Sequence, residues 1–529
     1  MDVLLISVPA LDSFDNPLVE RNPRSIAKWL DQLPLLNPAE TIMQLLNALR
    51  PLNRQMLTEK DRLRLLELYR EAVNAVFNAF TLRALRQVPL AAARREQIKQ
   101  AVTQLCLELA GGYKAVVLPA YQQGRSPAQE PALLLAAYCA MQQLIHALLH
   151  CFRIYEPVPP RVYLEIHQLY AWVEAADVCE QPIKLERETV TLGALYRRAL
   201  LLCCADPARL SEDEVLRVYA LLTLYAQHSR IVVGRCAPPH EGLFGFDLYA
   251  DAPPRPCAKH DAQGHSSQPR LLDARDVAAA VRAHTQAENA TTADEERRLL
   301  RMLLPHLEST VQRIAPRQSK QQHALAAAGI AAIHYYLSDP RRLKQDIAQA
   351  SHGIAVQHID AATEVVDHHS LDAWSVNNES DSGYLLSCAR RQSALRVGEL
   401  LGVVLLERTD AVMALELTVV RWMRHGADGG LEAGVERIHG AAAPVQCRLQ
   451  SDVTTSRQCL FLPSSSHQDR HATLLAPKRF YSRGQRMHVE VGGKPIIVEA
   501  GHLVMDTACF DRFVFHAQGE SADAPPSDA

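Results

Sequence analysis

The sequence predicts a multidomain α+β protein: an all-α N-terminal bundle or solenoid followed by two small antiparallel β domains. Its 529 residues exceed one ordinary core, since a domain takes roughly 150 residues. Apolar residues recur at helical spacing through residues 22–230, whereas short branched and aromatic runs separated by glycine and polar residues follow Pro316. The expected divisions are a helical domain (1–230), a strand-loop-helix connection (231–310), a β-barrel (311–440), a small β-rich domain (441–517) and a disordered tail (518–529).

Capping signals support the helical region. Asn37 precedes a proline, and the apolar residues that follow recur at helical spacing, namely Ile42, Leu45, Leu46 and Leu49. Thr58 precedes another segment with this period. Ser211 precedes a third, and Glu214 lies three residues after it, at the spacing of a capping box. Other expected helices are 97–110 (stopped by Gly111-Gly112), 128–152, 161–177, 192–204, 216–226, 276–284 and 295–314. Short connections between them favour antiparallel neighbours.

The expected strands are short. IVVGR and LFGFDLYAD indicate two strands in residues 231–270, around a loop rich in Pro, Gly and His. The first β domain is expected to be a barrel or sandwich with the segments AWSVNN, GYLLSC, RVGELLGVVLL, LELTVVRW and LEAGVERI. In the second, Gly492-Gly493 between HVEV and KPIIVEA predicts a two-residue hairpin turn.

Composition excludes several classes. Lys plus Arg is 56 against 59 for Asp plus Glu, so the net charge of −3 gives no general attraction to nucleic acid or anionic membrane. No apolar run reaches the ~18–20 residues of a membrane span, and the N-terminus lacks the basic start of a secretory signal. The twelve cysteines have no CxxC pair, and we interpret them as small buried side chains in a reducing, cytoplasmic protein.

Two motifs point to a ligand. Asn378-Glu379-Ser380-Asp381-Ser382-Gly383 lies between a strand ending at Val376 and one at 384–387, so that an amide and a hydroxyl flank a turn. Gly383 allows a close backbone approach or a positive φ. Upstream, Arg313 and Arg317 lie four residues apart and can reach one anionic ligand, since a guanidinium binds phosphate bidentately and also reads or stacks on guanine.

RxxxR followed by (D/N)xSxxG, with VVRW leading into a GV strand, resembles the PilZ family of cyclic di-GMP receptors over about residues 313–440. The resemblance implies a small β-barrel that binds cyclic di-GMP without catalysis or a cofactor. Its implied ligand-binding residues are Arg313, Arg317, Asn378, Ser380 and Gly383. It also implies that the helical region presents a surface to an unknown protein partner, in bacterial motility, surface attachment or biofilm formation.

The chain departs from the family pattern in the spacing of the two motifs. Residues 318–377 separate them, and AAAGIAAIHYYLSDPRRLKQ within this stretch indicates a helix or a strand plus helix. Lys320, Arg341 and Arg342 are therefore reserve candidates for phosphate contact. A degenerate PilZ-like scaffold that binds no nucleotide remains the alternative, in which the Asn378 motif is a plain turn and the two arginines cap a helix C-terminus.

Other residues have more ordinary interpretations. Trp374 and Trp422 are expected in the barrel core, and Arg421 and Arg424 are expected to point to solvent or a carboxylate. A third possibility is an enzyme with a metal held by Cys257, His260 and His265, but no second pair of ligands stands at zinc spacing. The Asp367-His368-His369 group is expected in a solvated loop, and GxSxG, HExxH and phosphate-loop motifs are absent.

Overall fold

The computed structural model divides the chain into two compact units, Met1–Gln312 and Arg313–Ala529. Each unit is described by itself below. The structure describes residues 3–14, 16–82, 85, 90–185, 188–238, 240–257, 267–286, 294–309, 318–354, 371–388, 395–406, 415–426, 430–464, 471–491 and 494–517. The expected disordered tail and the Asp367-His368-His369 group lie outside these residues.

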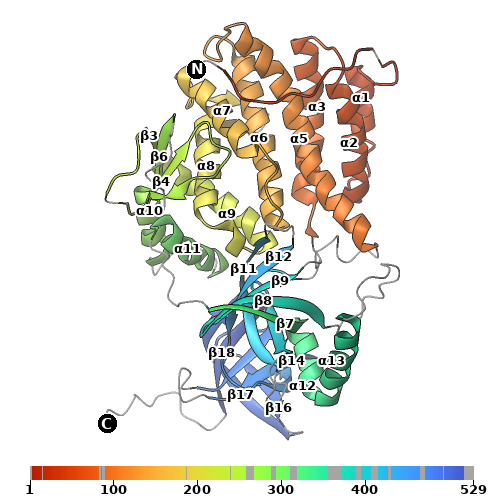
Figure 1. The fold of residues 1–529 in the computed structure, drawn as a ribbon, viewed down its shortest axis with the longest axis vertical. Helices are drawn as coiled ribbons and strands as arrows, with labels where there is room; N and C mark the ends of the chain where they lie inside the picture. The colour runs from red at the N-terminus through yellow and green to blue at the C-terminus, as the bar shows by residue number, and fades with distance from the viewer. Residues whose placement is uncertain are drawn as a thin grey trace. The chain divides into compact units, whose positions relative to one another are not determined.

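The N-terminal unit is mainly helical, as expected (Figure 1). Two long helices, α5 (Ala92–Gln122) and α6 (Pro131–Arg153), pack along each other at its centre. The other helices are α1 (Pro23–Leu30), α2 (Pro38–Asn53), α3 (Glu59–Ala79), α7 (Val162–Ala175), α8 (Leu192–Cys204) and α9 (Glu212–Tyr225), with short turns η1 (Pro207–Arg209) and η2 (Ala226–His228) and a two-stranded ladder, β1 (Ile183–Lys184) and β2 (Thr189–Val190).

The three predicted helix caps are confirmed. The side chains of Asn37 and Thr58 accept hydrogen bonds from the main-chain N–H groups of Glu40 and Asp61, and Ser211 forms the capping box.

The predicted stop at Gly111-Gly112 is wrong, because α5 continues through both glycines. A Cβ at Gly112 would come within 2.6 Å of Asn53 and 2.7 Å of Leu66, and one at Gly111 within 3.1 Å of Pro9. These glycines therefore serve close packing rather than chain reversal.

A four-stranded antiparallel sheet completes this unit. Its order is β3-β6-β4-β5, and the ring of Phe246 on β4 stacks on His167 of α7. The sequence indicated only two of these strands. The bounds are β3 (Arg230–Val233), β4 (Leu243–Asp247), β5 (Arg255–Pro256) and β6 (Pro269–Asp273), followed by α10 (Arg275–Gln286) and α11 (Asp294–Leu307).

The C-terminal unit begins with a closed six-stranded barrel in the order β10-β11-β12-β9-β8-β7. Its strands are β7 (Gln318–Ala328), β8 (Asp372–Ser380), β9 (Gly383–Cys388), β10 (Leu400–Leu405), β11 (Glu416–His425) and β12 (Leu431–Arg437). Helices α12 (Gly329–Ser338) and α13 (Pro340–Ile354) follow β7, so the strand-plus-helix interpretation of residues 326–345 is confirmed.

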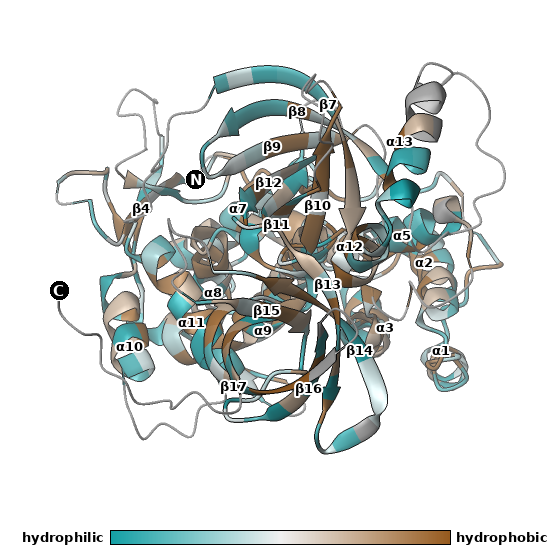
Figure 2. Cartoon of the chain, turned by 90° about the horizontal axis from the view of Figure 1, so that it is seen from below, coloured by the Kyte–Doolittle hydropathy of each residue, from teal (hydrophilic) through white to brown (hydrophobic). Residues whose placement is uncertain are grey.

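A second closed barrel follows, in the order β13-β14-β15-β18-β17-β16. Residue Val491 of β16 pairs with Lys494 of β17, which confirms the predicted hairpin, although Gly492 and Gly493 themselves are not described. Figure 2 shows β10 and β15 as almost uniformly hydrophobic strands. The bounds are β13 (Ala443–Leu449), β14 (Asp452–Leu462), β15 (Thr473–Pro477), β16 (Arg486–Val491), β17 (Lys494–Asp506) and β18 (Phe510–Ala517).

The two barrels share an apolar core through α12. Ile333 and Tyr336 of α12 are buried in one cluster with Leu400 and Val404 of the first barrel. The same cluster holds residues of the second barrel, namely Leu460, Leu462, Leu475 and Phe510. The inserted helix is therefore part of the hydrophobic core of this unit, which also matches the predicted fold class.

Two described helices are long and apolar enough, by length and composition only, to cross a membrane, although polar residues interrupt the apolar run of each. They are α5 and α6, and 72% and 78% of their apolar windows are buried inside the N-terminal unit. Such burial is typical of core helices.

Candidate functional site

The Asn378 motif forms the tip of the β8–β9 hairpin. Strand β8 extends to Ser380, beyond the end predicted at Val376, and Ser380 pairs with Gly383 across the turn at Asp381 and Ser382. The motif is thus mostly paired strand, and the barrel fixes its backbone.

A β-bulge at Asn377 turns Asn378 outward. Val376 pairs with Leu386, and both are buried inside the barrel, whereas Asn378 pairs with Leu385. Residues two apart on a regular strand share a face, so the extra residue moves Asn378 to the opposite face from Val376. Alternation then places Ser380 outward and Glu379 inward.

The two outward side chains are available to a ligand. Within the described part of the chain the Asn378 carboxamide has no hydrogen-bond partner, and its side chain is half-buried. Among the same described residues, the Ser380 hydroxyl has only local partners, the Ser382 hydroxyl at 3.1 Å and the Gly383 carbonyl at 3.4 Å. A ligand on the outer face of the barrel would meet one amide and one hydroxyl from the same strand.

Gly383 serves the barrel itself. A Cβ at this position would lie 1.9 Å from the carbonyl oxygen of Val435 on β12. The glycine therefore lets β9 and β12 approach at the end of the hairpin, a structural reason for the last residue of the motif.

Trp422 lies on the same outer face, which corrects its expected place in the core. Cross-strand pairs share a face, and the pairing runs from Trp422 to Gly434, Leu385, Asn378 and Ser319. The indole covers Gly434, where a Cβ would come within 2.0 Å of the indole nitrogen.

A second bulge explains the position of Trp422. It lies between Val420 and Trp422 on β11 and leaves Val420 inside the barrel. Trp374 is buried as expected. Arg421 and Arg424 pair with Glu436 and Glu432 at 2.7 and 2.9 Å, as expected.

Arg437, at the end of β12, holds the hairpin tip and was missed from the sequence. Its guanidinium donates to the carbonyl oxygens of Ser380 at 2.7 Å and Asp381 at 3.3 Å. Its main-chain N–H donates to the carbonyl of Ser382 at 2.8 Å. One residue thus binds three successive carbonyls of the turn.

The guanidinium of Arg437 is itself held by surrounding groups. It donates to Glu379 and to the Tyr384 hydroxyl, and contacts Glu416 at 3.4 Å. It also lies 4.2 Å from the centre of the Tyr384 ring. Burial tends to lower the pKa of Arg437, but Tyr384 and Glu379 raise it. Burial and the bond to Glu416 raise the pKa of Tyr384 to about 12.

Glu379 links this group to the strand β7. Its carboxylate accepts from Lys320 of β7 and from Arg437 of β12. Burial alone would raise the pKa of Glu379, but the bonds from Lys320 and Arg437 outweigh it and lower the pKa. The carboxylate therefore stays ionised between two cations.

Arg313 and Arg317 lie outside the described residues, but the strand that follows them is next to the motif. Gln318 pairs with Glu379 and Ser319 pairs with Asn378. Although residues 318–377 separate the two motifs in sequence, β7 and β8 are neighbouring strands. The insertion that contains α12 and α13 accounts for the unusual spacing.

The structure describes contacts for all three reserve candidates for phosphate contact, Lys320, Arg341 and Arg342. Lys320 pairs with Glu379, so its ammonium already has a carboxylate partner. Arg342 lies on α13, with its guanidinium 4.3 Å from the Tyr335 ring centre and 3.7 Å from Asp339. The main-chain N–H of Arg341 donates to the Asp339 carboxylate.

The alternative of a metal held by Cys257, which the sequence did not favour, loses its thiolate ligand. Cys257 forms a disulfide with Cys236, so no thiolate is available there. His260 and His265 lie outside the described residues, and among those that the structure describes no group of three potential ligands could hold a metal. The disulfide also corrects the interpretation that all cysteines are unpaired; the other ten are free.

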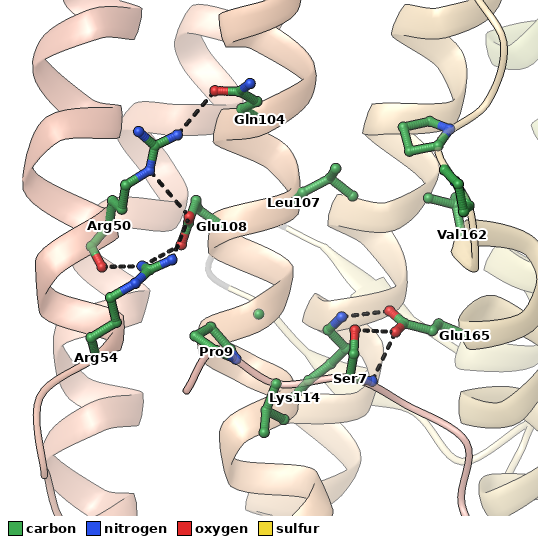
Figure 3. Close-up of a pocket in the computed structure, with 14 residues that line it drawn as sticks. Ser7, Pro9, Arg50, Arg54, Gln104, Leu107, Glu108, Lys114, Val162 and Glu165 are labelled. Carbon is green, nitrogen blue, oxygen red and sulfur yellow. Dashed lines mark hydrogen bonds and ion pairs between the residues drawn. The ribbon is translucent and has the colours of Figure 1, made fainter. Parts of the chain in front are cut away.

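Figure 3 shows a pocket of about 370 Å³ in the N-terminal unit, between the N-terminal segment and helices α2, α5 and α7. The buried ammonium of Lys114 lies 2.5 Å from Glu165, which also accepts from the main chain of Ser7 at 2.8 Å. Arg50 and Arg54 lie 3.4 and 3.3 Å from Glu108. Because the carboxylates and cations pair with one another, we interpret the pocket as the anchor of the N-terminal segment.

Comparisons with known proteins agree with the three-part architecture. Three family models match: the N-terminal domain of the cyclic-di-GMP receptor FimW at residues 24–236, its middle PilZ domain at 354–444, and its C-terminal β-barrel domain at 445–518. The match to the middle model starts at residue 354, so β7 lies outside the matched range.

The cyclic-di-GMP receptor FimW of Pseudomonas aeruginosa strain PAO1 is 26% identical over 585 aligned positions, which cover 97% of this chain and 93% of the relative. No solved structure matches significantly. From residue 354 onward, the barrel that carries the Asn378 hairpin is thus similar to a PilZ domain, and the segments on both sides are similar to the other two domains of the same receptor.

Proposed function

We propose that this protein is a receptor for cyclic di-GMP, which binds on the outer face of the first barrel. The observation that carries the proposal is the register of β7 against β8. It pairs the residue after Arg317 with Glu379, so the RxxxR segment leads directly to the Asn378 hairpin. The relative named as a cyclic-di-GMP receptor supports the same ligand.

Each group has a distinct role in the proposal. Arg313 and Arg317 bind the phosphates and the guanine edge, as the PilZ resemblance implies. Asn378 and Ser380 hydrogen-bond one guanine. Trp422 offers an aromatic surface in the same cross-strand row, and stacking on such a surface contributes about 1–3 kcal/mol per base.

The proposed role is that of a cytoplasmic, non-enzymatic receptor. Ligand binding would shift the equilibrium between arrangements of the chain, and the helical unit would present a surface to a protein partner in motility or surface attachment. The alternative of a scaffold that binds no nucleotide rested on the separation of the two motifs. That support is lost, since the intervening segment leaves and rejoins the barrel at neighbouring strands.

Calorimetric titration of cyclic di-GMP into the full chain tests the proposal. We expect micromolar or tighter binding, with at least about tenfold loss in Arg317→Ala, because a hydrogen bond to a charged group contributes about 1.5–3 kcal/mol. Ser380→Ala should weaken binding severalfold, because its bond to the neutral guanine contributes about 0.5–1.5 kcal/mol. Arg486→Ala is the matched control, since this exposed cation pairs with Glu499 on the second barrel. Cyclic di-AMP, with the same phosphates and another base, tests guanine recognition. Absence of heat and of any thermal shift in the wild-type chain would favour the alternative, a scaffold that binds no nucleotide.

A further inference from the structure

We propose that Arg437 is a positioning residue of the ligand site, which fixes the hairpin tip from inside the barrel so that Asn378 and Ser380 face outward at a constant spacing. This inference rests on the proposed function and adds a residue that neither motif contains.

The first argument is the number of turn groups that one residue binds. The carbonyl oxygens of Ser380, Asp381 and Ser382 all accept hydrogen bonds from Arg437, two from the guanidinium and one from the main chain. Asp381 and Ser382 are exposed to solvent. Without the guanidinium, the carbonyls of Ser380 and Asp381 would each lose a donor, and the turn would sample more conformations.

The second argument is that Arg437 is rigid before any ligand arrives. Its side chain is only 15% exposed, between the carboxylates of Glu379 and Glu416 and against the Tyr384 ring. A planar guanidinium with five donors suits such a set of acceptors, whereas a lysine ammonium cannot reach them together. The side-chain entropy of Arg437 is therefore lost on folding and not on ligand binding.

The third argument concerns the two faces of one strand. Glu379 points inward to Arg437 and Lys320, while its neighbours Asn378 and Ser380 point outward. Any rotation of Glu379 about the strand would rotate the two ligand-facing groups as well. The inner ion pairs thus determine the outer geometry, and Lys320 connects the same carboxylate to the strand that follows the RxxxR segment.

Affinity measurements on Arg437→Met and Arg437→Lys test the inference. We expect at least about tenfold weaker binding of cyclic di-GMP in the methionine variant. The lysine variant should show an intermediate loss, because it retains the positive charge but not the planar guanidinium with its five donors. Arg486→Met is the control for loss of an ion-paired strand arginine. The lysine variant keeps the test valid if the methionine variant does not fold.

A double-mutant cycle with Ser380→Ala separates positioning from general stability. If Arg437 acts through the turn, the Ser380→Ala loss should shrink markedly in the Arg437→Lys background, since Ser380 is then already misplaced. Additive losses would overturn the inference. Wild-type-like affinity in both Arg437 variants would overturn it too, while binding by the wild-type chain would leave the proposed function intact.

Hydrogen exchange in the ligand-free chain gives a second readout. We expect the amides of Asp381–Gly383 to exchange at least about tenfold faster in Arg437→Lys, with β10 and β15 unchanged. Unchanged exchange at the turn would contradict positioning even if affinity fell. If the wild-type chain bound no cyclic di-GMP, the proposed function and the ligand half of this inference would both fail.

Discussion

Gly383 lies where two strands of the first barrel come too close for any side chain. Gly383→Ala would place a Cβ 1.9 Å from the Val435 carbonyl, so the strands must separate. We expect a loss of about 3 kcal/mol in the free energy of unfolding. Urea denaturation followed by Trp fluorescence measures it. Gly484→Ala, at φ +76° with open space around it, should cost only about 1 kcal/mol. Equal losses would show that the backbone angle, not the clash, matters at both positions.

Trp422 provides a prediction about ligand affinity with little effect on stability. Trp422→Ala removes the outer-face aromatic surface, so we expect cyclic di-GMP to bind about tenfold more weakly. The melting temperature should fall much less than in Trp374→Ala, because Trp374 is only 3% exposed. In the unmodified chain, ligand should quench Trp fluorescence, and this change should vanish in Trp422→Ala. Retained quenching would place the base elsewhere.

The sequence indicated part of the candidate site, and physical reasons explain what it did not indicate. Asn378 and Ser380 were named as candidates because both lie in one contiguous pattern. Trp422 was assigned to the core because regular alternation from Val420 points it inward, and only the bulge reverses this. Arg437 was missed because its role depends on the register of β12 against β9, which no local pattern encodes.

At the scale of elements, the disulfide joins the ends of two short strands. Cys236 follows β3 and Cys257 follows β5, 21 residues apart. Reduction should lower the stability of the sheet region by about 3 kcal/mol, through the extra freedom of the unfolded loop. Calorimetry with and without reductant measures this, and Cys236→Ser should melt alike in both. Alkylation under denaturing conditions should label ten cysteines before reduction and twelve after it. Twelve labelled cysteines at once would refute the bond.

Two buried histidines make the helices α6 and α7 sensitive to acid. Burial lowers the pKa of His150 to about 3 and that of His167 to about 4, against about 6.5 in the unfolded chain. Between these values the unfolded state binds more protons, so stability falls as the pH drops below 6.5. At pH 5 each histidine should cost about 2 kcal/mol relative to pH 7.

Urea denaturation at pH 7 and pH 5, followed by far-ultraviolet circular dichroism, tests this. His150→Gln should reduce the difference between the two pH values, whereas substitution of the exposed His228 serves as the control. A pH difference unchanged by His150→Gln would mean that other groups cause the acid sensitivity.

At the scale of the whole molecule, the segment between the described residues Ser309 and Gln318 joins the two units and contains both RxxxR arginines. If cyclic di-GMP binds these arginines, it ties the connection to the first barrel and changes the distribution of distances between units. Small-angle X-ray scattering of the full chain should therefore show a ligand-dependent radius of gyration. Ser380→Ala should respond only at proportionally higher ligand concentration. An unchanged scattering curve at saturating ligand would mean that ligand binding acts without a change in the distances between the units.

The fold class could be predicted because the helical and the strand periods of apolar residues occupy different parts of the chain. The order in which the strands connect in the first barrel could not be predicted. Strand β7 starts with the polar run Gln318–His323 and then changes to Ala and Leu, so it has no alternating pattern. The glycines in α5 read locally as a stop, because the neighbours that require them, Asn53 and Leu66, lie on other helices.

The position of α12 has a consequence for how this unit can evolve. Each barrel closes on its own hydrogen bonds, so by topology either could be exchanged like a module. Their packing prevents such an exchange, because Ile333 and Tyr336 of α12 are buried in one apolar cluster with Leu460 and Phe510 of the second barrel. A recombination event that kept one barrel and lost the other would expose this surface to water and favour aggregation. Packing around the inserted helix thus favours retention of both barrels together, although the described strands of each barrel pair only with one another.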